Sequence, residues 1–108
     1  EGWERFEVPA VRLDSLLDDP VDFLKMNIEG VETTVLEAAG AALRNVREMV
    51  VEYHHLPELP RTLHRLLGVL ADQGFDYRVH DIHGERHGPF ELAADTRAFP
   101  LVHAVRRD

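Results

Sequence analysis

The sequence predicts an α/β fold, because segments with the apolar period of a strand alternate with segments that have the period of a helix. Residues 21–28, 48–54 and 75–80 have the length and the apolar, β-branched and aromatic content that are typical of strands. Residues 31–43 and 60–73 repeat apolar side chains every three or four positions, as one face of a helix does. Alternating strands and helices favour a mostly parallel sheet with right-handed crossovers.

The first element that we expect is a strand over residues 6–13, followed by a short helical turn over residues 14–19. Pro9 lies inside this strand and suits an edge or a bulge. The second strand, residues 21–28, has apolar side chains on both faces. It is therefore expected to be covered by helices on both sides.

The two expected helices each carry one apolar stripe, with Val31, Val35, Leu36, Ala39 and Leu43 on the first and Leu63, Leu66, Leu67 and Leu70 on the second. The polar residues 81–98 predict a long loop, and residues 99–105 predict the last strand. No helix separates the last two strands, so they are expected to form an antiparallel pair at an edge of the sheet.

With 108 residues the chain has the size of one domain, residues 1–108. Within it, residues 1–20 are the opening strand and turn, and residues 21–108 are the strand-helix-strand-helix-strand-strand unit. Lys and Arg number 12 against 20 Asp and Glu, for a formal net charge of −8. We expect neither nucleic acid nor an anionic membrane to be a partner, because both would repel this charge.

Cysteine is absent, which excludes disulfides, thiolate metal sites and a Cys nucleophile. No apolar run approaches the ~20 residues that span a bilayer. The N-terminus, which is not a Met, does not resemble a secretory signal. We therefore expect a cytoplasmic protein cut from a longer chain.

Residues 22–32 read DFLKMNIEGVE, which resembles the strand-to-helix element D-x-x-K-x-D-x-E-G-x-E of the FkbM-type methyltransferase family. Residues 35–39 resemble its VLxGA helix, residues 50–54 its next strand, and residues 11–17 its V-x-L-D-x-L segment. The resemblance covers about residues 8–80. It departs from the family at Asn27, where the family has Asp, and at Ala39-Gly40, which replaces Gly-Ala.

The resemblance implies a partial Rossmann-like methyltransferase sheet, of which this chain is the C-terminal half. It also implies S-adenosylmethionine-dependent O-methylation of a hydroxyl on a small molecule or sugar. The donor-binding half of such a fold needs a glycine-rich turn and an acid for the ribose, and the sequence has no G-x-G-x-x-G-like cluster. We therefore predict no cofactor-binding residue here, and no activity for the isolated chain.

Ligands of open α/β sheets bind beyond the carboxyl ends of the strands, where Asn27 and Glu29 are expected. There Asn27 can orient a hydroxyl, Glu29 can accept its proton, and Glu32 can contact the substrate. Alternatively, Asn27 caps the following helix while both glutamates complement its dipole. Lys25 is expected to be structural and to pair with a carboxylate.

Glu52 and His54 end the next strand and are the second pair of catalytic candidates, with His55 as a substrate contact. A His–Glu pair there can deprotonate a hydroxyl or hold a divalent metal. Alternatively, Glu52 is a buried partner of Lys25, and both histidines are loop residues.

A third cluster has spacings that resemble those of metal ligands, and it comprises His80, Asp81, His83, Glu85 and His87. No helix or hairpin signal fixes these side chains, so we favour a solvated loop and predict no metal ligand. Two functions other than methyl transfer remain open: a non-catalytic remnant that dimerises, and a histidine-mediated metal-binding domain. The resemblance places residues 21–28 centrally in the parent sheet, beside a strand that is missing here. An unpaired strand recruits another chain, so we expect a homodimer.

Overall fold

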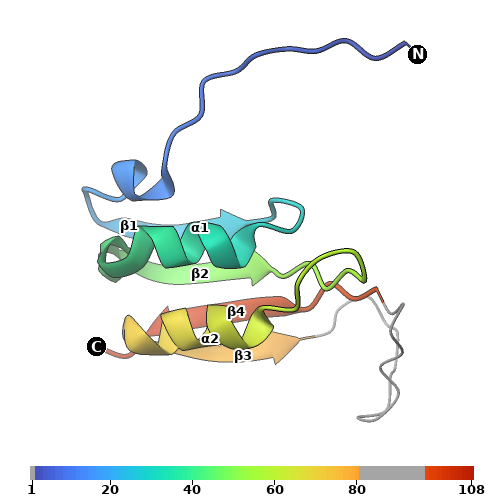
Figure 1. The fold of residues 1–108 in the computed structure, drawn as a ribbon. Helices are drawn as coiled ribbons and strands as arrows, with labels where there is room; N and C mark the ends of the chain where they lie inside the picture. Colours follow the sequence, from blue (N-terminus) through green and yellow to red (C-terminus); the bar gives the residue numbers. More distant parts are fainter. Residues whose placement is uncertain (1, 81–96) are drawn as a thin grey trace.

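The computed structural model describes residues 2–80 and 97–108, which form a mixed sheet with both α-helices on one face (Figure 1). The strands are β1 (Val21–Met26), β2 (Val46–Glu52), β3 (Phe75–His80) and β4 (Leu101–Arg106). The helices are α1 (Glu32–Ala39) and α2 (Leu63–Asp72), and two 3-10 helices are η1 (Leu13–Leu16) and η2 (Gly40–Asn45). No helix in the described part of the chain is long and apolar enough to cross a membrane.

The sheet has the order β1-β2-β4-β3, with β1 and β2 parallel and β4 antiparallel to both of its neighbours. The α/β class and the antiparallel closing pair are therefore confirmed. The expectation of a mostly parallel sheet was wrong, because β4 inserts between β2 and β3 and makes two of the three pairings antiparallel.

The core lies between the sheet and the two helices, which cover only one of its faces (Figure 1). On β1, Met26 is buried on the helix side, whereas Phe23 on the opposite side is 53% exposed. The expectation that helices cover both sides of this strand was therefore wrong for the described residues. The helix-facing residues include Leu36, Leu43, Met49, Val51, Leu66, Leu70, Phe75 and Val102.

The expected strand over residues 6–13 does not form. Residues 2–12 have no regular structure and run away from the sheet (Figure 1), and η1 begins at Leu13. The apolar side chains of this segment are largely exposed, from 70% at Val11 to 92% at Trp3. A strand needs a neighbour for its backbone groups, and none of the described strands pairs with this segment.

The helix expected over residues 31–43 divides at Gly40, whose φ of 51° stops α1 and begins η2. The second helix begins at Leu63 rather than at Pro60, and its leucine stripe is confirmed because Leu66 and Leu70 are buried. Strand β1 ends at Met26, two residues earlier than expected, which leaves residues 27–31 free to form a turn.

Candidate active site at the carboxyl ends of β1 and β2

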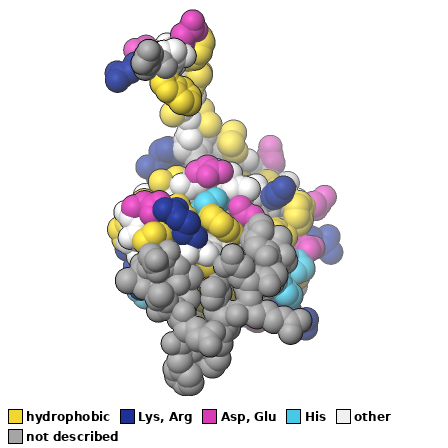
Figure 2. Space-filling model, turned by 90° about the vertical axis from the view of Figure 1, so that its right-hand side faces the viewer, with side chains coloured by type: hydrophobic (Ala, Val, Ile, Leu, Met, Phe, Trp, Pro, Cys, Tyr) yellow, Lys and Arg dark blue, Asp and Glu magenta, His cyan; other side chains and the backbone are white. Residues whose placement is uncertain are grey.

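The carboxyl ends of β1 and β2 lie side by side, because these two strands are parallel and paired from Val21 to Met26. The turn that follows β1 and the residues that follow β2 therefore meet at one edge of the sheet. Figure 2 faces this edge and shows acidic side chains gathered around a histidine. This is the edge at which open α/β sheets bind their ligands.

The turn after β1 is tightly constrained. Glu29 has a φ of 63°, unusual for a residue other than glycine, and Gly30 has a φ of 116°. The side chain of Leu59 fills the space that a Cβ on Gly30 would need. Asn27 and Glu29 are exposed on this turn, with 85% of the Glu29 side chain accessible. Both lie at the strand end where the sequence predicts them.

The carboxylate of Glu32, in the first turn of α1, is buried and only 1% exposed. Its Oε2 accepts hydrogen bonds from the backbone N–H of Gly30 at 2.9 Å and of Ile28 at 3.3 Å. Its Oε1 accepts from the backbone N–H of His54 at 3.1 Å, and Oε2 lies 3.0 Å from the Nδ1 of the same histidine. Glu32 therefore joins the turn after β1 to the end of β2.

His54 lies at the centre of this cluster, with a side chain that is 4% exposed. Its Nε2 faces two carboxylates and lies 3.6 Å from Glu52 Oε2 and 3.8 Å from Glu29 Oε2. Both distances exceed a direct hydrogen bond and are those of charge–charge contacts. Phe99 packs edge-on against the imidazole, with 5.4 Å between ring centroids.

Sequence patterns do not predict the contact of Phe99 with His54, because the two rings are 45 positions apart and meet only when β4 inserts beside β2. Sequence patterns also do not show that the carboxylate of Glu32 is buried while that of Glu29 is exposed. The signal in the sequence that could have indicated this difference is the spacing of the two glutamates on either side of Gly30. A turn that needs Gly30 brings the second carboxylate back over its own backbone N–H groups.

His55 follows on the opposite side of the backbone and forms a bridge with Ala98, in which each N–H donates to the other's carbonyl. Its Nε2 is buried and has no hydrogen-bond partner. Burial, followed by the positive charge of Arg61, lowers the pKa of His55 below its ordinary value. The ring is thus held neutral with one polar atom that a water or a ligand must satisfy.

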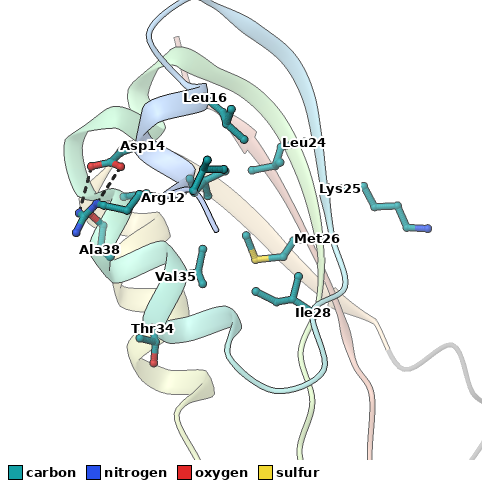
Figure 3. Close-up of a pocket in the computed structure, with 13 residues that line it drawn as sticks. Arg12, Asp14, Leu16, Leu24, Lys25, Met26, Ile28, Thr34, Val35 and Ala38 are labelled. Carbon is teal, nitrogen blue, oxygen red and sulfur yellow. Dashed lines mark hydrogen bonds and ion pairs between the residues drawn. The ribbon is translucent and has the colours of Figure 1, made fainter. Parts of the chain in front are cut away.

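Lys25 does not have the structural role that the sequence predicts. Among the described residues no carboxylate pairs with it, and Figure 3 shows its side chain pointing away from the groove beside β1. This groove has a volume of about 500 Å³ and lies between η1, β1 and α1. Leu24 and Met26 point into it from β1, and Ile28 from the turn that follows, as the face they share in sequence predicts (Figure 3).

The described residues do not fit S-adenosylmethionine by themselves. Gly30 is the glycine in the turn at the carboxyl edge, and the side chain of Leu59 packs against it. The other glycines with positive φ, namely Gly2, Gly40 and Gly74, lie elsewhere in the fold. A glycine-rich turn of the kind that holds a nucleotide is therefore not formed in residues 2–80 and 97–108.

The histidine cluster after β3 lies mostly outside the described residues. His80 is exposed at the end of β3, while Asp81, His83, Glu85 and His87 fall in the part of the chain that the structure does not describe. Within the described ranges, no group of three or more His, Asp or Glu side chains is arranged to hold a metal ion.

Comparison with known proteins gives one match. Residues 2–77 match the family model of the methyltransferase FkbM domain, which covers the extended N-terminal segment, β1, α1, β2, α2 and the start of β3. No curated protein and no solved structure matches the chain.

Proposed function

Because this chain belongs to the methyltransferase FkbM domain family, we propose that it forms the acceptor-binding part of an S-adenosylmethionine-dependent O-methyltransferase. Its acceptor is a hydroxyl group on a small molecule or sugar. In such a reaction S-adenosylmethionine supplies an electrophilic methyl group. The acceptor must be held in line with that group and must lose its proton, and the residues at the carboxyl edge are suited to these two tasks.

The observation that carries this proposal is the convergence of Glu52 and Glu29 on the Nε2 of His54. A hydroxyl that enters between them can donate to Glu52, whose side chain is 18% exposed. Glu52 then takes the proton, with the imidazole of His54 beside it. The exposed Glu29 accepts a hydrogen bond from a neighbouring hydroxyl, and Asn27 orients the acceptor from the same turn.

His55 is proposed as a further substrate contact, because its unpartnered Nε2 needs a hydrogen bond that a bound ligand or water can supply. Glu32, in contrast, already has donors on both of its oxygens. We therefore propose a role for Glu32 that does not involve direct substrate contact.

The strand order supports a place for this chain in the C-terminal half of a Rossmann-like sheet. Because β4 is antiparallel to β2 and to β3, the strands β1, β2 and β3 all run in one direction. Their order across the sheet is that of strands 4, 5 and 6 of the doubly wound fold, with one antiparallel strand inserted. In that assignment the donor-binding strands would lie beside the free edge of β1.

The test is Glu52→Gln in a complete methyltransferase that contains this domain. We expect kcat to fall by ~10²–10⁴-fold, the range for loss of a general base, with little change in the dissociation constant of the donor. Glu48→Gln is the matched control, because Glu48 lies on the same face of β2 but pairs with His103 away from the carboxyl edge. Unchanged turnover in the Glu52 variant would remove this residue from the mechanism.

A second candidate function is an assembly module, which the free edge of β1 favours. This strand has β2 on one side and no partner among the described strands on the other. The apolar groove beside it and the exposed apolar residues of segment 2–12 are surfaces that a second copy of the chain can cover. We propose a homodimer with β1 or segment 2–12 at the interface.

A further inference from the structure

The buried carboxylate of Glu32 accepts hydrogen bonds from two segments of the chain, and its contact with His54 links residues 22 positions apart in sequence. The backbone N–H groups of Ile28 and Gly30 come from the turn after β1, and that of His54 comes from the end of β2. The Nδ1 of His54 completes the set at 3.0 Å. Four contacts approach the capacity of a carboxylate with two oxygens.

These contacts determine which nitrogen of His54 carries a proton. The Oε2 of Glu32 already accepts from two backbone N–H groups, so it acts as an acceptor toward the groups around it. The imidazole Nδ1 must therefore be the donor in the 3.0 Å contact. In the neutral ring the lone pair then lies on Nε2, the atom that faces Glu52 and Glu29.

The same carboxylate also shapes the turn that carries Glu29. Its bonds to Ile28 and Gly30 close a loop in which Glu29 and Gly30 both have positive φ, a conformation that an unsupported turn would rarely keep. Glu29 is thereby directed toward the imidazole, with Oε2 3.8 Å from Nε2. Glu32 thus aligns groups from two different strands.

We propose that Glu32 is a positioning residue that fixes His54 as the Nδ1–H tautomer and directs its Nε2 lone pair toward the acceptor site. The proposal rests on the proposed methyltransferase function for its catalytic meaning. The tautomer and the turn can, however, be measured in the 108-residue chain without any turnover.

The first measurement is long-range ¹H–¹⁵N NMR of the histidine rings at about pH 8, well above the ordinary pKa of imidazole. We expect His54 to carry its proton on Nδ1. In Glu32→Gln the amide group cannot accept all four hydrogen bonds, so we expect a mixture of tautomers. We also expect at least ~10-fold faster exchange of the Gly30 amide proton, because the turn opens more often.

The matched control is Glu37→Gln, which removes a carboxylate from the exposed side of the same helix, where Glu37 pairs with Arg65. This variant should keep the tautomer of His54 and the exchange rate of Gly30. A proton on Nε2 in the wild-type protein overturns the proposal, as does a pure Nδ1–H form in a folded Glu32→Gln variant. If the Glu32→Gln variant does not fold, the tautomer of His54 in the wild-type protein decides between support and contradiction of the proposal.

The outcomes separate the two proposals. Unchanged turnover of Glu52→Gln with an Nδ1–H tautomer at His54 contradicts the catalytic role and leaves the positioning contact in place. An Nε2–H tautomer at His54 with reduced turnover of Glu52→Gln contradicts the positioning contact and leaves the catalytic role in place. In a complete enzyme, Glu32→Gln should lower kcat and alter its pH profile while it leaves donor binding unchanged.

Discussion

Gly30 and Leu59 are packed so closely that a Cβ on Gly30 would overlap the Cδ1 of Leu59, whose side chain would have to move. Gly30 also has a φ of 116°, which residues with a Cβ avoid. We expect Gly30→Ala to lower the free energy of unfolding by ~2 kcal/mol or more, from backbone strain and steric clash together. Urea denaturation followed by circular dichroism measures this.

Gly68→Ala is the matched control for that substitution. Gly68 lies inside α2 with open space around it, so alanine should stabilise the helix by ~0.5–1 kcal/mol. A Gly30→Ala variant as stable as wild type would contradict the close packing of the turn.

Arg106 joins the last strand to three other parts of the fold. Its guanidinium donates to the carbonyls of Val46, Gln73 and Leu43 and lies over the ring of Phe75, 4.4 Å from the centroid. Arg106→Met should lower the free energy of unfolding by about 3 kcal/mol, because it removes three hydrogen bonds to part-buried carbonyls.

Arg107→Met provides the comparison for Arg106, since the neighbouring guanidinium makes only long contacts of 3.4 Å or more. Arg107→Met should lower the free energy of unfolding by less than ~1 kcal/mol. Equal losses in the two variants, measured by urea denaturation, would show that Arg106 has no special role.

The lowered pKa of His55 makes stability depend on pH. Because burial lowers the pKa of His55 in the folded state, the unfolded chain binds this proton more readily below the ordinary value of 6.5. His55 therefore costs no stability at pH 8 and destabilises the fold as pH falls through the range below about 6.5. His55→Gln should reduce this loss.

The pH prediction is checked by thermal unfolding of both proteins between pH 8 and pH 5. Between pH 8 and pH 5, the Tm of the wild-type protein should fall by more than the Tm of His55→Gln. A difference that does not change with pH would mean that His55 is not the group responsible.

The free edge of β1 leads to a prediction about mass. Light scattering at micromolar concentration should give twice the 12.3 kDa of one chain. Phe6 is 78% exposed on the extended segment, and Phe6→Glu should shift the equilibrium toward monomer. Glu7→Gln on the same segment should not. A monomer for the wild-type chain would exclude the proposed homodimer.

The 108-residue chain should not bind S-adenosylmethionine with useful affinity, because its described residues form no glycine-rich turn at the carboxyl edge. Isothermal titration calorimetry tests this, with a complete member of the family in the same buffer as the positive control. A micromolar dissociation constant for the chain would show that the donor site lies within it.

Local patterns were sufficient to predict the bounds of strand β3 (Phe75–His80). They also predicted the buried leucines of α2, because period and burial coincide on that helix. The positions of Glu29, Glu52 and His54 followed from one rule, that residues after parallel strands meet at one edge. At residues 6–13 the sequence indicated an extended segment. It could not show whether a neighbouring strand exists for this segment to pair with. Pairing is a property of the tertiary structure, and Phe6 has no strand beside it.

The position of β4 was beyond local patterns for a related reason. The pattern of residues 101–106 predicts a short apolar strand, but it does not predict that this strand inserts between β2 and β3. The contacts of Glu32 were also hidden, since an acid in the first turn of a helix usually faces solvent and complements the helix dipole. Here the turn at Gly30 directs it inward.

The insertion of β4 has a consequence for the order in which the molecule is made. Strand β3 touches the rest of the sheet only through β4, which is synthesised some twenty residues later. When residues up to His80 have left the exit tunnel of the ribosome, the nascent chain has β1, β2 and a β3 segment, but not yet the strand β4 that β3 pairs with. The sheet is completed only when Leu101–Arg106 has left the exit tunnel, so until then the edges of β2 and β3 stay open to other chains.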